Sequence, residues 1–237
     1  RGIGAATCTL AAQQGGAVAV NYSANSLAAD EVVRSIRSQG GHAMAVQADV
    51  ADEDQVLRMF EKIDAKLGHL TGLVNNAGVV DVTARVQDQS LERWRRMFDI
   101  NVMGSMLCAR EAVRRMSTSL GGQGGSIVNV SSAAARLGAP GQYVDYAAAK
   151  GAIDAFTIGL AKEVGRDGIR VNAVRPGLIE TDIHASGGLP NRVRDLQHQV
   201  PMGRGGSAQE VAQLMVWLLS DAASYTTMSL IDISGGR

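Results

Sequence analysis

Aromatic residues and cysteines are scarce in this chain of 237 residues, which holds three Phe, four Tyr, two Trp and two Cys. So few cysteines exclude a disulfide-stabilised scaffold. With 46% hydrophobic and 19% charged residues, the composition also excludes a disordered chain. Because aromatics are few, the core must be built from Ala, Val, Ile, Leu and Met, which commonly fill the space between helices and a parallel sheet.

Neither sign of charge is in excess, because 23 Lys and Arg residues balance 23 Asp and Glu residues. A nucleic-acid-binding protein normally carries a basic surplus, so we expect no nucleic-acid partner. No apolar run approaches the ~18 residues of a membrane span, and no secretory signal is visible at the start. We expect no membrane association and a cytoplasmic location, with Cys8 and Cys108 as buried free thiols.

Segments typical of strands alternate with helical segments along the whole chain. The predicted strands are residues 17–22, 42–47, 70–75, 126–130, 169–174 and 229–233, and the predicted helices are 5–14, 26–38, 52–67, 91–118, 144–164 and 208–219. This alternation indicates a parallel sheet with helices on both faces. Right-handed crossovers make such a sheet doubly wound. We predict a single α/β domain of the Rossmann type over residues 1–237, with a polar flap at 178–206 within it.

The first residues read Arg1-Gly2-Ile3-Gly4 and pass at once into a helix. A helix that opens on glycines usually follows a strand in nucleotide-binding folds. We therefore expect the natural chain to have roughly ten more residues before Arg1, forming the central strand and the start of a glycine-rich turn. The alternative is an ordinary helix N-terminus with two glycines, and the two glycines alone do not decide between these possibilities.

Polar residues follow five of the predicted strands, at the point where each strand ends. They are Asn21-Tyr22-Ser23, Asp49-Val50, Asn75-Asn76-Ala77-Gly78, Ser131-Ser132 and Arg175-Pro176-Gly177. Ligands of doubly wound sheets bind beyond the carboxyl ends of the strands. We therefore expect these five segments to converge on one edge and to form the binding site.

Tyr146 and Lys150 are four residues apart near the start of a predicted helix, so they share a face. A phenol titrates near ~10, and a neighbouring ammonium lowers that pKa by stabilising the phenolate. The pair can thus serve as a general acid or base toward an alcohol or carbonyl. The alternative is a surface tyrosine and a surface lysine, since such pairs are common by chance.

Two further polar residues strengthen the catalytic interpretation. Ser132 follows a strand, and its hydroxyl could orient a substrate carbonyl and stabilise charge on its oxygen. Asn101 lies inside a predicted long helix, where asparagine competes with the backbone for hydrogen bonds. A solvated helix position is the alternative for Asn101.

Taken together, these residues resemble the short-chain dehydrogenase/reductase family. The matching features run in order along the chain: Arg1-Gly2-Ile3-Gly4, Asp49-Val50, Asn75-Asn76-Ala77-Gly78, Asn101, Ser132, Tyr146-x-x-x-Lys150, and Pro176-Gly177 with Thr181. Each motif alone is weak, and their combination is specific. Within the family the chain looks most like bacterial sugar dehydrogenases and 3-oxoacyl reductases.

The resemblance implies a catalytic tetrad and a nicotinamide dinucleotide cofactor. Tyr146 would be the acid or base, and Lys150 would tune its pKa and anchor the cofactor's ribose. Ser132 would bind the carbonyl oxygen, and Asn101 would hold a water that relays protons. The residues implied to contact the cofactor are Arg1, Gly2, Ile3, Gly4, Asn21, Tyr22, Ser23, Asp49, Val50, Asn76, Ala77, Gly78, Tyr146, Lys150, Pro176, Gly177, Ile179 and Thr181.

The region that selects between NAD and NADP lacks an acid. An acidic residue about 20 positions after the glycines would bind the ribose 2′-hydroxyl and favour NAD. Here that region is Asn21-Tyr22-Ser23, which contains no acid, and the next acidic residue is Asp30 in the following helix. Arg1 is placed to pair with a 2′-phosphate. We expect NADP(H) as the cofactor; the alternative is a solvated Arg1 and a site that accepts NAD as well.

We expect an enzyme that transfers hydride between nicotinamide and a carbonyl or secondary alcohol of a small molecule. The alternative is a catalytically weak dinucleotide-binding sensor or scaffold on the same fold. The flap would cover the substrate, with Gly187-Gly188 as a candidate hinge. The four histidines show no ligand spacing, so we expect no metal.

Two predicted helices, 91–118 and 144–164, carry more apolar residues than one sheet-covering face needs. Such an excess predicts packing against partner copies, as a homodimer or homotetramer. The alternative is a monomer whose extra apolar residues lie under neighbouring loops.

Overall fold

All paired strands are parallel in the computed structural model, which describes residues 1–237. The strands are β1 (Val18–Tyr22), β2 (Ala43–Gln47), β3 (Gly72–Asn75), β4 (Gly125–Val130), β5 (Ile169–Pro176) and β6 (Leu230–Ile233). Helices flank them, so the predicted α/β class with a parallel sheet is confirmed.

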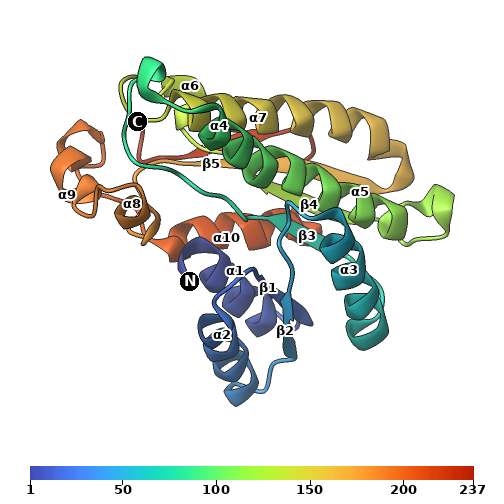
Figure 1. Ribbon diagram of the computed structural model, residues 1–237. Coiled ribbons are helices and arrows are strands. Elements are labelled where there is room, and N and C mark those ends of the chain that lie inside the picture. Colours follow the sequence, from blue (N-terminus) through green and yellow to red (C-terminus); the bar gives the residue numbers. More distant parts are fainter.

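The strands form two sheets. β1 pairs with β2, and the other strands follow the order β3-β4-β5-β6. β1 and β3 each have one edge without a strand partner, and both contribute to the wall of a cavity of about 1230 Å³. Figure 1 shows the β1–β2 pair standing apart from β4 and β5. The expected strand before Arg1 stays a prediction.

Helices connect the strands and cover both faces of the four-stranded sheet, with α5 and α7 on one side and α10 on the other (Figure 1). The helices are α1 (Gly2–Gln13), α2 (Ser26–Ser38), α3 (Glu53–Leu67), α4 (Leu91–Phe98), α5 (Gly104–Met116), α6 (Ala134–Leu137), α7 (Val144–Val164), α8 (Ile183–Ser186), α9 (Arg192–Leu196) and α10 (Ala208–Leu219). None of them combines the length and the apolar composition needed to cross a lipid bilayer.

Several helix starts follow directly from the sequence. The side chains of Asn25, Asp52 and Ser90 each accept a hydrogen bond from a backbone amide of the first turn of α2, α3 and α4. Ser207 and Glu210 form a reciprocal capping box at α10. Each such cap stabilises its helix by ~1 kcal/mol, which explains why these boundaries were predictable within a residue or two.

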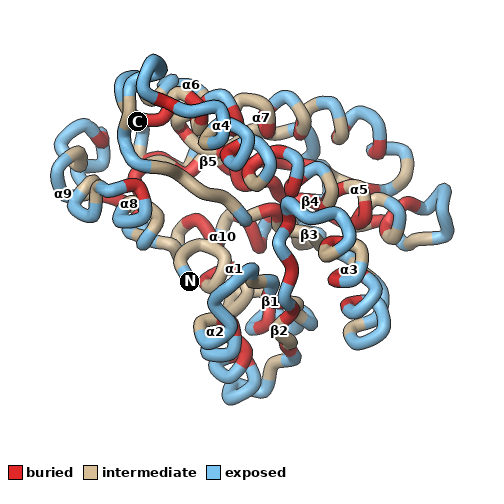
Figure 2. The backbone as a smooth tube through the Cα atoms, in the orientation of Figure 1, coloured by how far each residue is buried: buried red, intermediate tan, exposed pale blue.

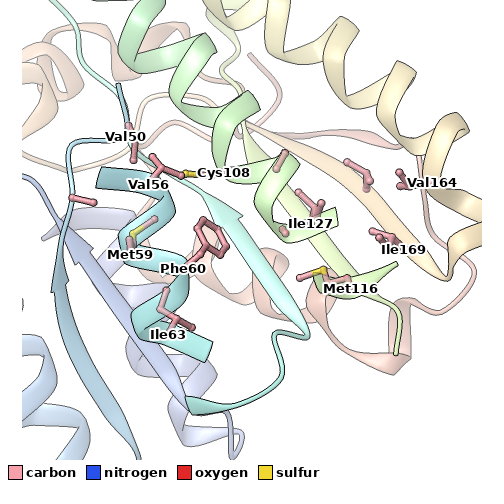
Figure 3. Packing of buried hydrophobic residues seen from close by; sticks show 14 of the residues in the cluster. Val50, Val56, Met59, Phe60, Ile63, Cys108, Met116, Ile127, Val164 and Ile169 are labelled. Atoms are coloured by element: carbon pink, nitrogen blue, oxygen red, sulfur yellow. The ribbon is translucent and has the colours of Figure 1, made fainter. Parts of the chain in front are cut away.

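The largest core cluster joins α3, α5 and α7 to β2, β4 and β5, with Phe60 and Met116 near its centre (Figure 3). β4 serves two clusters alternately, because Ile127 packs into this one while Val128 and Val130 pack against α10. That alternation follows from the two-residue period of a strand. Figure 2 shows buried residues concentrated where the helices meet the strands, with exposed outer faces. A two-sided core of this kind holds the carboxyl ends of β4 and β5 in place.

The predicted helix 91–118 is interrupted. α4 and α5 are separated by a π-helical turn, η2 (Asp99–Met103), which contains Asn101. Residues 178–206, predicted to form a flap, contain the two short helices α8 and α9, and their role as a flap stays a prediction. In Figure 1 these lie beside the C-terminus, away from the β1–β2 pair.

Candidate active site

Lys150 occupies the second turn of α7 with its ammonium enclosed. Its Nζ donates to the backbone oxygen of Val130 at the end of β4, at 2.7 Å. Its own backbone oxygen accepts the Ser131 hydroxyl at 3.1 Å. Burial lowers the pKa of Lys150 to about 8, and the nearby Asp154 carboxylate acts in the opposite direction. The ammonium therefore persists at neutral pH and still has N–H donors to offer a ligand.

Tyr146 lies one turn earlier on the same face of α7, and Lys150 Nζ is 5.6 Å from the centre of its ring. Burial raises the pKa of Tyr146, while a hydrogen bond with Ser132 opposes that rise. The expected lowering of this pKa by Lys150 does not appear in the chain by itself, because loss of water around the phenolate outweighs the stabilising contacts. The phenol thus holds its proton at neutral pH, as a general acid must.

Ser132 follows β4 and lies beside Tyr146. Its Oγ accepts a hydrogen bond from the backbone amide of Ala134 at 3.1 Å, which orients the hydroxyl at the start of α6. The Tyr143 and Tyr146 rings meet edge to face with centres 6.5 Å apart. The structure therefore brings Ser132, Tyr146 and Lys150 together at the carboxyl end of β4, as predicted from the sequence.

Asn101 is fully buried in the π-helical turn. Its Nδ2 donates to the backbone oxygens of Met97 and Val79, at 3.0 and 3.1 Å, and its Oδ1 accepts the amide of Val79 at 3.2 Å. A Cβ on Gly78 would lie 2.7 Å from that Oδ1 and 3.6 Å from Lys150 Nζ. Asn101 thus fixes the strand-end loop 76–79 against the lysine, and the water relay stays a prediction.

Sequence reasoning missed a chain of buried polar groups beneath this loop. Asn75 Nδ2 donates to Asn129 Oδ1 at 2.9 Å, and Asn129 Nδ2 donates to Thr157 Oγ1 at 2.9 Å. The Thr157 hydroxyl in turn donates to the backbone of Ile153 on α7. These bonds tie β3, β4 and α7 together directly under the site. Their partners are 28 and 54 residues apart in sequence, so no local pattern signals them.

The glycines that would face a cofactor have no room for a side chain. A Cβ on Gly4 would lie 2.7 Å from Asn76 Nδ2. Gly2 has a φ of +58°, which favours glycine, and its Cβ would lie 3.4 Å from Thr181. Gly177 packs as closely against Ser234. The N-terminal turn therefore packs closely against Asn76 and Thr181, and the residue after β5 packs against Ser234.

Several of the remaining predicted contact residues line the large cavity. Arg1, Gly4, Asn21, Tyr22, Ser23, Val50, Asn76 and Ala77 lie along its wall. Asn21 donates across to the backbone oxygens of Val46 and Ala48, and Asp49 accepts the amide of Ala51. Arg1 forms an exposed pair with Asp182, with Nη1 and Oδ2 3.7 Å apart. Ile3 and Ile179 pack in or beside the cluster under α10, and Pro176 is buried at the end of β5.

Two arginine contacts near Tyr146 were also not foreseen. Arg93 of α4 makes two hydrogen bonds to Asp145, the residue before Tyr146, at 2.7 and 3.2 Å. Arg192 of the flap donates to Gln142 and to the Tyr143 hydroxyl, at 2.6 and 3.3 Å. Both contacts join segments about 50 residues apart, which only the fold brings together.

Groups that would support other chemistry are not assembled. No cluster of three or more His, Cys, Asp or Glu side chains could hold a metal ion. Cys8 and Cys108 are both free, but only Cys108 is buried, whereas Cys8 is partly exposed, contrary to the expectation. Burial raises the pKa of Cys8 to about 11 and that of Cys108 to about 12, so neither forms a thiolate at neutral pH.

Comparison with known proteins agrees with this geometry. The profile of the family described as Enoyl-(Acyl carrier protein) reductase matches residues 1–237. The uncharacterized oxidoreductase YgfF of Escherichia coli is 56% identical over 237 residues, which cover 100% of this chain and 96% of the relative. Cis-4-hydroxycyclohexanecarboxylate dehydrogenase of Sinomonas cyclohexanicum is 40% identical over 238 residues, covering 99% and 92% of the two chains.

A 3-oxoacyl-[acyl-carrier-protein] reductase of a Synechocystis species is 38% identical, over 100% of this chain and 92% of the relative. Among solved structures, a mutant short-chain dehydrogenase/reductase of Serratia marcescens superposes with a TM-score of 0.91 at 31% identity, covering 100% and 93% of the two chains. The fold, the order of the motifs and these relatives together place the chain in the short-chain dehydrogenase/reductase family of oxidoreductases.

Proposed function

We propose that this protein is an NADP(H)-dependent oxidoreductase that interconverts a ketone and a secondary alcohol on a small molecule. A bound nicotinamide would supply or accept the hydride at the substrate carbon. In the direction of reduction, the carbonyl carbon gains two electrons and one hydrogen, and the carbonyl oxygen takes its proton from the Tyr146 phenol. The balanced reaction consumes one reduced cofactor and one proton for each alcohol formed.

The observation that carries this proposal is the half-buried, protonated Tyr146 beside Ser132 and the enclosed Lys150 ammonium. The Ser132 hydroxyl would donate to the carbonyl oxygen and fix it beside the phenol. The ammonium would favour the phenolate left after proton transfer. Its unused N–H donors suit the hydroxyls of a ribose. Lys150 is held by the backbone oxygen of Val130, and Ser132 by the backbone amide of Ala134.

For the cofactor we propose NADP(H) over NAD(H). The support is the lack of an acid at 21–23, where a carboxylate would repel a 2′-phosphate. Arg1 lies on the wall of the same cavity as Asn21 and Ser23, and its exposed pair with Asp182 is weak enough to exchange for a phosphate. The contacts of Asp49, Val50, Pro176, Gly177, Ile179 and Thr181 with the cofactor belong to the same proposal.

The substrate is proposed at the level of a carbonyl or hydroxyl compound. By their names, one relative oxidises cis-4-hydroxycyclohexanecarboxylate and another reduces 3-oxoacyl groups on acyl carrier protein. Both names fit chemistry at a carbonyl or secondary alcohol. A sensor or scaffold on this fold would not need a protonated phenol beside a serine and a buried ammonium, which favours the enzyme. The flap role of 178–206 and a cytoplasmic location remain predictions.

We also propose that the protein assembles into a homotetramer or homodimer. Phe98, Met103 and Met106 on the α4–α5 side are 38 to 49% exposed. On α7, Ala148, Ala155 and Gly159 form an exposed row of small residues. Apolar and small side chains on neighbouring helices suit close packing against the same helices of another copy.

Tyr146→Phe tests the proposed mechanism, because it removes the acid and keeps the ring. Reduction of ketones with NADPH should fall at least about a hundredfold, the scale of general acid catalysis, while NADPH binding should stay near that of the parent. Tyr225→Phe is the matched control, since Tyr225 is fully exposed and should lose nothing. Retention of most activity by Tyr146→Phe would refute the mechanism.

A further inference from the structure

Arg192 is a half-buried guanidinium with no carboxylate partner. It belongs to α9 in the flap, and it takes part in none of the ion pairs of the chain. Its protein partners are neutral, because Nη1 donates to Gln142 Oε1 at 2.6 Å and to the Tyr143 hydroxyl at 3.3 Å. Arg194, two residues later on α9, is by contrast paired with Asp195.

Most of the hydrogen-bonding capacity of Arg192 is unused. A guanidinium has five N–H donors, and here only Nη1 donates to protein atoms. Nε and Nη2 remain, and they form the edge that binds a carboxylate through two parallel bonds. The contact with Gln142 and Tyr143 thus fixes one side of the guanidinium and leaves the other side for a ligand.

The location of Arg192 connects it to the catalytic tyrosine. Its Cζ is 5.2 Å from the centre of the Tyr143 ring, and the Tyr143 and Tyr146 rings meet edge to face, with centres 6.5 Å apart. Next to them, a Cβ on Gly187 of the flap would lie 3.5 Å from the Tyr143 hydroxyl. Arg192 therefore stands on the flap side of the Tyr146 site, where the part of a substrate remote from the carbonyl would lie.

The surroundings of Arg192 are electropositive. Its charge is among the causes that lower the pKa of Tyr146, of His184 and of Arg237, although burial is the larger influence on each of these groups. A cation that disfavours the protonated form of three neighbouring groups, with no acid to neutralise it, is stabilised by any anion that enters.

We infer that Arg192 binds a carboxylate on the substrate, so that the protein acts on small oxo- or hydroxy-carboxylates rather than on neutral ketones. This inference rests on the proposed oxidoreductase function. The carbonyl would lie at Ser132 and Tyr146, and the carboxylate would take the free Nε–Nη2 edge. A purely structural role, in which Arg192 only fastens the flap to Gln142 and Tyr143, predicts equal effects on acidic and neutral substrates.

The test compares matched pairs of acids and their methyl esters with NADPH as reductant: 4-oxopentanoate and 4-oxocyclohexanecarboxylate against the corresponding esters. The variants are Arg192→Met, which keeps an unbranched side chain and removes the charge, and Arg192→Lys, which keeps the charge and removes the bidentate edge. Arg194→Met is the control from the same helix. NADPH affinity is measured separately by fluorescence titration for every variant.

The parent should reduce at least one acid with a kcat/KM about ten- to a hundredfold above that of its ester, the scale of a charge-assisted hydrogen bond. Arg192→Met should abolish that preference mainly through KM, Arg192→Lys should restore part of it, and Arg194→Met should leave it unchanged. NADPH affinity should be the same in all variants.

A parent that reduces esters as well as acids would overturn the inference and leave the proposed function intact. An Arg192→Met variant that loses acid and ester reduction equally would show a structural latch, and one that loses NADPH affinity would show a cofactor contact; either result overturns the inference. If no ketone of any kind is reduced, the proposed function itself fails and the inference fails with it.

Discussion

Replacing Arg93 with methionine would leave the Asp145 carboxylate buried without its partner. The Arg93 side chain is 8% exposed and that of Asp145 is 1% exposed, and two hydrogen bonds of 2.7 and 3.2 Å join them. Arg93 Nη1 also donates to the backbone oxygen of Val82 at 2.6 Å. The single residue thus ties α4, the loop at 79–84 and the first turn of α7 together.

The expected loss follows from this enclosure. Removing one partner of a buried ion pair costs about 3–5 kcal/mol, because the remaining charge is neither solvated nor paired. For a domain of this size, each kcal/mol lowers Tm by about 2–4 °C, so Arg93→Met should lower Tm by roughly 10 °C. Activity should fall further than stability alone explains, because Asp145 directly precedes Tyr146 and sets the start of α7.

Urea unfolding measures the free energy of unfolding without adding salt, which would screen the ion pair. A double variant with two apolar residues completes the test. Arg93→Met with Asp145→Leu should regain most of the lost stability, because no unpaired charge remains. Arg96→Met is the control: Arg96 lies on the same helix but pairs with Asp81 at 3.7 Å near the surface, so its loss should cost under about 1 kcal/mol. If Arg93→Met is as mild as Arg96→Met, or the double variant is no better than the single one, the reasoning is wrong.

Three further outcomes are expected. NADPH should bind more tightly than NADH, and Arg1→Ala should narrow the difference in a fluorescence titration; equal affinities in the parent would contradict the NADP proposal. Because burial lowers the pKa of Lys150 to about 8, the ammonium is lost above that pH, so NADPH binding should weaken as pH rises through it. Asp154→Asn removes a charge that raises this pKa and should move the weakening to lower pH, whereas binding independent of pH would speak against a role for the ammonium. In light scattering, a mass near the 24.8 kDa of one chain would refute the oligomer, and a mass two or four times larger would support it.

The elements and the grouping of Ser132, Tyr146 and Lys150 were predictable because their signals are local. Strand-end polar residues, the i, i+4 spacing of Tyr146 and Lys150, and side-chain caps such as Ser207 act over a few residues. The interruption of the 91–118 helix was indicated only in part, because the sequence places Asn101, a poor helix-forming residue, inside it. What the sequence could not show is its bonding partner, Val79, 22 residues earlier in the chain, which stabilises a π-helical turn instead of a regular one.

The pKa shifts and charge contacts of the site were harder to predict from the sequence. The effect of Lys150 on Tyr146 was expected to dominate from spacing alone, yet the direction of the pKa shift depends on how much water the fold removes from the phenol. Arg93 and Arg192 carry no distinguishing local pattern among the many arginines of the chain. Only the packing of α4 and α9 against the start of α7 separates them from surface arginines such as Arg194.

The buried Asn75–Asn129–Thr157 connection also bears on how the strands find their alignment during folding. β3 and β4 pair with Asn75 opposite Asn129. The apolar residues of these strands would tolerate many alignments, but a slip of one residue reverses the faces of all side chains. It would then break the bond between the buried Asn75 and Asn129 amides, at a cost of about 1–3 kcal/mol for each polar group left unpaired. These polar groups penalise misaligned sheets, and the carboxyl end of β4 therefore presents Ser132 at one defined height beside α7.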